Sequence, residues 1–303
     1  MANIERKIQI QSVIYGNEKQ SLYRAIKALV QAVKVYKKRG NLISAQLVYG
    51  DASPEKIFNE EDIDYIKEIT ADEIEFAYKY FGFNSGTAKG HNLMASEADG
   101  EYILIMNPDV ILETSALVHM FDAFDQDEKI AMVEARQTPL EHAKEYDQKT
   151  GETEWASTAC TIFRKKAYDE IGGFDADTFF LYCDDLDFSW RLRLAGYKIV
   201  YVPNAVVYHA KTLTTDACWK PTGAEVYYSA EAALLLAYKW SNFDRVKHLK
   251  KVFENVGGEA EKKAVNEFVK RESENKLPDC IDPDHKIARF LDDDYCEMRF
   301  KIG

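Results

Sequence analysis

Acidic residues and one histidine stand where they could do chemistry. A cluster of aspartates at 184–187 (DDLD) directly follows the apolar run FFLYC. Asp51 and Asp109 each come after a segment with the composition of a strand, and His209 ends the apolar segment VVYH. Carboxylates and imidazoles bind divalent cations and transfer protons. Helix capping, ligand binding and proton transfer are therefore the three roles to separate at these positions.

Structural interpretations exist for most of these residues. Asp51 lies in GDASP and Asp109 in NPD, which are both typical turn sequences. A single histidine such as His209 is more often structural than a ligand.

The aspartate cluster also has a structural interpretation. Asp184 could be the N-cap of a helix. Asp187 stands four residues before Arg191, the spacing of an intrahelical ion pair. Asp185 is less well explained in this way.

The pattern of apolar residues predicts the elements that would position this chemistry. Alternating or continuous apolar segments predict strands at 8–15, 43–50, 74–81, 102–106, 130–135, 158–163 and 198–202. Helical spacing predicts helices at 21–38, 60–69, 89–98, 113–125 and 165–171. The alternation of strands and helices indicates an α/β fold with a mostly parallel central sheet flanked by helices. Ligands of such sheets bind beyond the carboxyl ends of the strands.

The part of the chain beyond His209 is predicted to be helical, with helices at about 222–240, 243–254, 258–274 and 285–300. We therefore expect a catalytic domain at 1–211 and a helical region at 212–303. Acceptor binding, formation of a homodimer and membrane contact are the roles left open for this region. Its segment 245–251, RVKHLKK, is basic and could lie on anionic lipid or be a solvated helix face.

Composition and charge restrict the class of protein. The 303 residues carry a formal net charge of −12, which argues against general nucleic-acid binding. The five cysteines include no Cys-x-x-Cys pair and indicate reduced thiols. The charged N-terminus does not resemble a signal peptide, and no apolar segment is long enough to cross a bilayer. We expect a cytoplasmic protein, with association at the inner face of a membrane left open.

Two long stretches resemble signatures of the family-2 glycosyltransferases. The first is NSGTAKGHNLMASEADGEYILIMNPDVIL, which contains the family's Asn-Pro-Asp after a strand. The second, TACTIFRKKAYDEIGGFDADTFFLYCDDLDFSWRLRLAGYKIVYVPNAVVYHA, contains Gly-Gly-Phe-Asp, an acidic pair, an arginine, Ala-Gly-Tyr and a terminal histidine. The similarity covers about residues 8–210 and is closest in pattern to rhamnosyl- and galactofuranosyl-transferase-like members. It implies the GT-A fold and inverting transfer of a sugar from a nucleoside-diphosphate-sugar.

The resemblance implies a role for each candidate residue of the reaction. Asp109 and His209 would bind Mn²⁺ or Mg²⁺, Asp185 would be the catalytic base, and Asp184 would orient or contact the acceptor. Trp155 would be an aromatic side chain near the acceptor, with core packing as an equal alternative.

The donor nucleotide would contact Asp51, Asn17, Lys89 and Asn107, although a solvated lysine is the simpler interpretation of Lys89. A UDP- or dTDP-linked donor is favoured, and glycan, lipid-linked and protein acceptors remain open. The family's processive motif Gln-x-x-Arg-Trp does not follow His209, which favours addition of one sugar or a short chain.

Three departures from the family pattern keep alternatives open. Asn107 replaces the first acid of the Asp-x-Asp motif, Asp184 replaces the usual glutamate, and VIYGN at 13–17 replaces Ile-Pro-Thr-Tyr-Asn. A glycosyltransferase-like module that binds without turnover is therefore one alternative. A sugar-phosphate nucleotidyltransferase is a weaker one, because the segment 10–25 lacks a glycine-rich basic loop.

Overall fold

An eight-stranded sheet organises the protein. The computed structural model describes residues 5–210, 215 and 221–291. The strands lie in the order β3-β2-β1-β4-β7-β6-β8-β5. They are β1 (Glu5–Ile14), β2 (Leu42–Asp51), β3 (Glu75–Tyr80), β4 (Tyr102–Met106), β5 (Val110–Leu112), β6 (Ile130–Thr138), β7 (Cys160–Arg164) and β8 (Lys198–His209).

The sheet is mostly parallel, as predicted. β1 pairs in parallel with both β2 and β4, β2 with β3, and β6 with β8. β7 runs antiparallel between β4 and β6, and β5 runs antiparallel to β8 at the edge. The carboxyl ends of β1, β2 and β4 therefore lie at one edge of the sheet, where ligands of open α/β sheets bind.

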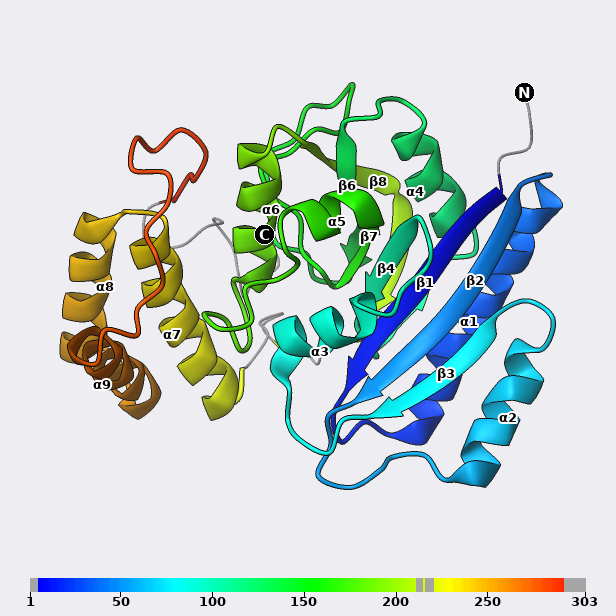
Figure 1. Ribbon diagram of the computed structural model, residues 1–303, viewed down its shortest axis with the longest axis horizontal. Helices are drawn as coiled ribbons and strands as arrows, with labels where there is room; N and C mark the ends of the chain where they lie inside the picture. Colours follow the sequence, from blue (N-terminus) through cyan, green and yellow to red (C-terminus); the bar gives the residue numbers. More distant parts are fainter. Residues whose placement is uncertain (1–4, 211–214, 216–220, 292–303) are drawn as a thin grey trace.

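Helices cover both faces of the sheet (Figure 1). One face packs against α1 (Lys19–Lys38), α2 (Glu60–Thr70) and α4 (Ala116–Phe124) through a large apolar cluster. The other face packs against α3 (Gly86–Ala95), α5 (Lys165–Glu170) and α6 (Asp184–Leu194) through a smaller cluster. These two clusters form the core of the layered fold.

Three further helices form a lobe beside α6 (Figure 1): α7 (Gly223–Lys239), α8 (Phe243–Asn255) and α9 (Glu259–Ser273). A third apolar cluster joins the two parts, since it contains Leu186 and Trp190 of α6 as well as Leu235 of α7. The predicted boundary at 211/212 lies outside the described residues. The lobe shares its core with the helix that carries the acidic pair.

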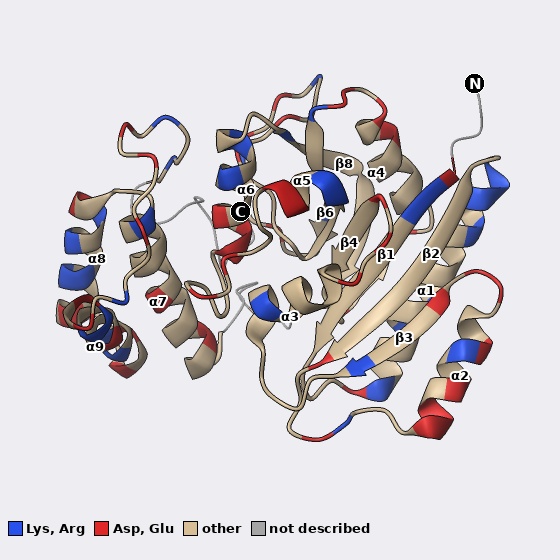
Figure 2. Ribbon diagram, in the orientation of Figure 1, with Lys and Arg blue, Asp and Glu red and all other residues tan. Residues whose placement is uncertain are grey.

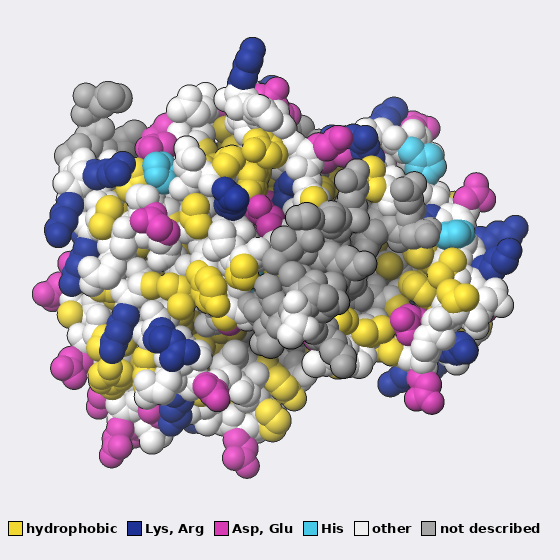
Figure 3. Space-filling view, turned by 180° about the vertical axis from the view of Figure 1, so that it is seen from behind, with side chains coloured by type: hydrophobic (Ala, Val, Ile, Leu, Met, Phe, Trp, Pro, Cys, Tyr) yellow, Lys and Arg dark blue, Asp and Glu magenta, His cyan; other side chains and the backbone are white. Residues whose placement is uncertain are grey.

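The lobe exposes charges of both signs. Lys247, His248 and Lys251 of α8 are exposed, and Asp244 and Glu254 of the same helix are exposed as well. Figure 2 shows the basic residues of α8 on the side away from the sheet, and Figure 3 shows charged side chains between the apolar ones on the reverse face. No helix in the described ranges is long and apolar enough to cross a membrane.

Three elements differ from the sequence prediction. β8 continues to residue 209, because a bulge opposite Ala135 and Arg136 takes up the residues around Pro203 that looked like a strand end. β5 has three residues and is too short to show a periodicity. The helix predicted at 285–300 is wrong for residues 285–291, which are not helical, and its remainder lies outside the described residues.

Candidate active site

The pairing of β5 with β8 brings together residues that are far apart in the sequence. Val110 of β5 lies opposite His209 of β8, so the Asn-Pro-Asp turn after β4 ends beside the histidine. Asp109 Oδ1 lies 3.3 Å from His209 Nε2, and Asn107 Nδ2 lies 3.4 Å from the same nitrogen. The structure thus brings the three predicted residues into one group.

Gln137 fixes the orientation of the His209 ring. His209 Nδ1 lies 2.7 Å from the Gln137 Oε1 acceptor, while the Gln137 amide nitrogen donates to Ser157 Oγ at 3.1 Å. Because the Gln137 oxygen can only accept, this network places a ring proton on Nδ1, and Nε2 faces Asp109. Hydrogen bonds of this kind orient histidines that bind metals.

The donor set fits a divalent cation bound together with phosphate. Across the described ranges, no three His, Cys, Asp or Glu side chains gather into a complete metal site. Cations such as Mg²⁺ commonly bind through one or two carboxylates, with substrate phosphates and water as the other ligands. Asp109, whose side chain is 36% exposed, and the oriented imidazole of His209 match that pattern. We conclude that these residues fit Mn²⁺ or Mg²⁺ on a diphosphate.

The acidic pair lies at the start of α6, after two residues with left-handed backbone. Tyr182 has a φ of 68° and Cys183 a φ of 56°. Such a conformation is unfavourable for residues other than glycine and clusters at functional sites. Cys183 is the N-cap and Asp184 the first helical residue, so the N-cap interpretation of Asp184 is wrong.

The two members of the pair have different surroundings. Asp184 is buried, and its Oδ2 accepts a hydrogen bond of 2.9 Å from Thr87 Oγ1 of α3. Burial, together with the neighbouring Asp185 carboxylate, raises the pKa of Asp184 to about 7. Asp185 is half-buried, and its Oδ1 accepts from the backbone N–H of Leu186. Asp185 is therefore the more accessible carboxylate.

Asp187 has a structural role, as predicted. It is fully buried, and its Oδ2 accepts from Arg191 Nε at 2.7 Å. This is the i,i+4 ion pair that the sequence predicts.

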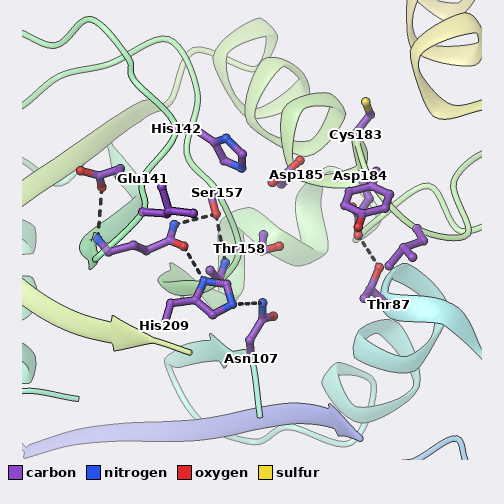
Figure 4. A pocket seen from close by; sticks show the side chains of 15 residues that line it. Thr87, Asn107, Glu141, His142, Ser157, Thr158, Cys183, Asp184, Asp185 and His209 are labelled. Atoms are coloured by element: carbon purple, nitrogen blue, oxygen red, sulfur yellow. Dashed lines mark hydrogen bonds between the residues drawn. The ribbon is translucent and has the colours of Figure 1, made fainter. Parts of the chain in front are cut away.

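A pocket separates the histidine group from the acidic pair (Figure 4). Its volume is about 140 Å³, roughly ten times the space that one water molecule needs. Asn107 and His209 line one side, and Asp184 and Asp185 line the other. The pocket can therefore hold part of a ligand between the histidine group and two carboxylates.

The residues predicted to contact the donor nucleotide lie away from this pocket, apart from Asn107. Asp51 ends β2 and is fully buried, where it accepts hydrogen bonds from the backbone of Ser53 and Ile57 and from the Tyr78 hydroxyl. In this conformation its carboxylate holds the loop after β2 and has no exposed surface for a base. Its contact with the donor stays a prediction that requires this loop to move.

Asn17 and Lys89 lie near the same edge of the sheet. Asn17 follows β1, is partly exposed and accepts a hydrogen bond from the backbone of Tyr15. Lys89 is exposed in the first turn of α3, with Nζ 5.1 Å from the centre of the Phe83 ring. Their roles in binding the donor stay predictions.

Trp155 lies in the apolar core. It is 6% exposed, belongs to the apolar cluster shared with α7, and has Lys144 Nζ 4.0 Å from its ring centre. It does not line the pocket, so the structure supports the packing interpretation. Its contact with the acceptor stays a prediction.

The sequence interpretation missed several polar residues of the pocket lining. These are Thr87, Gln137, Glu141, His142, Ser157 and Thr158. Most lie in loops or at strand ends, where no periodicity marks them. Thr87 and Thr158 lie within the two stretches that resemble the family signatures, and this position was the signal that could have marked them.

The comparisons with known proteins agree with this geometry. Residues 144–227 match the family model described as "Glycosyltransferase like family 2". Over 61 residues, 20% of each chain, the protein is 43% identical to the N-acetylglucosaminyl-diphospho-decaprenol L-rhamnosyltransferase of Mycobacterium tuberculosis. It is 27% identical over 156 residues to the poly-beta-1,6-N-acetyl-D-glucosamine synthase of Staphylococcus aureus, covering 45% of this chain and 37% of the synthase.

Solved structures support the fold. The mannosyltransferase PcManGT from Pyrobaculum calidifontis, in complex with GDP-Man and Mn²⁺, has a TM-score of 0.59 at 13% identity, over 89% of this chain and 76% of that one. GalNAc-T7 with UDP, GalNAc and Mn²⁺ has a TM-score of 0.61 at 13% identity, over 89% and 55%.

These findings show the GT-A fold for this chain, together with similarity to glycosyltransferase family 2 over part of its length. They confirm the resemblance to glycosyltransferase family 2. The segment that matches the family model, residues 144–227, contains the acidic pair and His209. The chain spans only 20% to 37% of the length of the curated relatives that it matches.

Proposed function

We propose that the protein is an inverting, metal-dependent glycosyltransferase that moves a sugar from a nucleoside-diphosphate-sugar to an acceptor hydroxyl. The observation that carries this proposal is the pocket with Asp109 and His209 near one side and Asp184 and Asp185 on the other. One group suits a diphosphate with its cation, and the other suits a hydroxyl that must lose a proton.

The proposed reaction assigns a proton transfer to Asp185. As the bond between the anomeric carbon and the diphosphate oxygen breaks, the acceptor oxygen bonds to the opposite face of that carbon. The acceptor proton passes to the Asp185 carboxylate, and the nucleoside diphosphate leaves. General base catalysis of this kind typically contributes about 10²–10⁴-fold to the rate.

The neighbouring groups position the reactants. Asp184, fixed by Thr87, orients the acceptor. Asp109 and His209 would hold Mn²⁺ or Mg²⁺, which would stabilise negative charge on the leaving diphosphate. Asn107 lies beside His209, and Asn17, Lys89 and Asp51 are proposed to bind the remainder of the donor.

The donor and acceptor classes are part of the proposal. A UDP- or dTDP-linked sugar is favoured; one structural neighbour carries UDP and another carries GDP-Man. The names of the relatives support an acceptor in cell-surface glycan synthesis, either a glycan or a lipid-linked sugar. Such an acceptor fits a cytoplasmic protein that works at the inner face of a membrane.

Calorimetric titration with UDP, dTDP, GDP and CMP, each with and without Mn²⁺, tests the donor side. We expect one diphosphate to bind only with Mn²⁺, and the binding to weaken strongly in Asp109→Asn. Gln126→Ala on the surface serves as a control. Absence of binding by folded protein to all four nucleotides would refute the donor site.

Asp185→Asn tests turnover separately. We expect the variant to keep nucleotide affinity and to lose about 10²–10⁴-fold in turnover, measured as release of nucleoside diphosphate. If the wild-type protein binds a nucleotide-sugar but neither it nor the variant turns the donor over, a binding module without catalysis is the correct interpretation.

A further inference from the structure

Lys239, the last residue of α7, forms ion pairs with two aspartates of the catalytic domain. Its Nζ lies 2.7 Å from Asp175 Oδ2 and 2.7 Å from Asp187 Oδ1. The Lys239 side chain is 8% exposed and that of Asp187 is fully buried. Buried charges require partners of opposite sign, so this lysine compensates both carboxylates at once.

The two aspartates lie on either side of the acidic pair in the sequence. Asp175 precedes the segment 176–186, which contains Asp184 and Asp185, and Asp187 follows it. Lys239 therefore connects the beginning and the end of this segment.

Each aspartate also binds its local backbone or helix. Asp175 Oδ1 accepts from the backbone N–H of Thr178 at 3.1 Å. Although burial favours its neutral form, the hydrogen bonds from Lys239 and Thr178 lower the pKa of Asp175. The Asp187 carboxylate holds Arg191, whose guanidinium donates to the backbone carbonyls of Ile171 and Gly173.

A second residue from the helical lobe binds Asp187. Trp240 Nε1 donates to Asp187 Oδ1 at 3.1 Å, and the indole is fully buried against Trp190 of α6. Position and orientation of the first turn of α6 thus depend on the end of α7.

The beginning of α7 contacts the other part of the same segment. The Tyr182 hydroxyl donates to Glu225 Oε1 at 3.3 Å, and the rings of Phe180 and Tyr228 lie 4.9 Å apart. The left-handed backbone at Tyr182 and Cys183 is sparsely populated and persists only where its surroundings hold it. The beginning of α7 supplies such contacts within the segment, and its end supplies them at the two flanking aspartates.

We propose that Lys239 is a positioning residue for the acidic pair, and that the helical lobe is thereby part of the catalytic apparatus. The inference deepens the proposed function and rests on it for the role of Asp185. Lys239 acts through Asp175 and Asp187, which fix the segment that presents the pair to the pocket.

Kinetics of Lys239→Met, Lys239→Arg and Glu231→Gln test this inference. Glu231 of α7 is the matched control, because it is buried in an ion pair with Arg271 of α9, within the helical lobe. We expect Lys239→Met to lose about 10²-fold in kcat, the effect of a displacement of about 1 Å at a reacting group. The donor KM should stay within about threefold, Lys239→Arg should recover most of kcat, and Glu231→Gln should stay near wild type.

Two outcomes would overturn the inference. One is a kcat of Lys239→Met within about threefold of wild type. The other is an equal loss in Glu231→Gln, which would show that any weakening of the lobe has the same effect. If Lys239→Met does not fold, Trp240→Phe takes its place, since it removes the indole N–H that binds Asp187 and keeps an aromatic ring at this position.

Hydrogen exchange separates this inference from the proposed function. We expect the amides of residues 179–187 to exchange at least tenfold faster in Lys239→Met than in wild type, and those of β1 to be unchanged. Faster exchange in a protein without transferase activity would refute the proposed function and leave the positioning role intact. Unchanged exchange in an active enzyme would refute the positioning role alone.

Discussion

Replacement of Asp184 by Asn should stabilise the protein at neutral and alkaline pH and have little effect in acid. Burial and the Asp185 carboxylate raise the pKa of Asp184 from 3.8 to about 7. A difference of one pKa unit corresponds to about 1.4 kcal/mol. The ionised form therefore costs the folded protein up to about 4 kcal/mol.

The sign of the effect follows from proton binding. Because the folded state binds this proton more tightly than the unfolded state, the free energy of unfolding falls as the pH rises from about 4 to about 7. Asparagine carries no such charge, and its amide oxygen can still accept from Thr87. The stabilisation by Asp184→Asn should be near zero at pH 4 and should reach about 2–4 kcal/mol at pH 8. The lower values in this range apply if Asp184 shares its proton with Asp185.

Urea unfolding of wild type and Asp184→Asn at pH 5, 6, 7 and 8 measures this difference. Asp99→Asn is a suitable control, because Asp99 is exposed and lies in an ion pair with Lys7 far from the pocket. A stability difference between Asp184→Asn and wild type that is the same at all four pH values would refute the reasoning. If Asp184→Asn also loses turnover, the wild-type protein retains a carboxylate that lowers its stability because the reaction requires it.

Three further predictions concern the groups around the pocket. Gln137→Leu should weaken Mn²⁺-dependent nucleotide binding about 10- to 100-fold in calorimetry, because it removes the hydrogen bond that orients His209; unchanged affinity would show that the ring needs no such support. Gly86→Ala should lower the melting temperature more than Gly40→Ala, because both glycines have positive φ but only a Cβ at Gly86 would lie 2.3 Å from another atom, the carbonyl oxygen of Phe180; equal shifts would contradict this. Lys144→Met should cost about 3–5 kcal/mol in urea unfolding, since it leaves the fully buried Glu134 without its cation, and a loss below about 1 kcal/mol would contradict the buried ion pair.

The sequence was sufficient for the layered fold and for the composition of the site. Continuous apolar strands such as 102–106 and helical spacing at 21–38 carry strong periodic signals, and both elements lie where the patterns predict. The resemblance to family 2 assigned Asn107, Asp109 and His209 to one site, and the structure brings them together.

The remaining features depend on tertiary contacts that no local pattern encodes. The burial of Asp51 depends on Tyr78 and the loop after β2, and the orientation of His209 depends on Gln137 of a neighbouring strand. Lys239 looked like an ordinary basic residue at the end of a helix, yet it binds two aspartates more than 50 positions away. These contacts form between elements distant in the chain, so single-sequence periodicity could not reveal them.

The pairing of β5 with β8 also bears on how the proposed cation site would form during folding. Asp109 and His209 are separated by a hundred positions and become neighbours only through the alignment of Val110 with His209. A growing chain that has not yet added β8 has half of the ligand pair. A cation that needs both side chains would therefore bind the finished sheet in preference to earlier folding intermediates, and would stabilise that state by mass action. If the proposed cation binds, it would then favour completion of the sheet as well as the reaction.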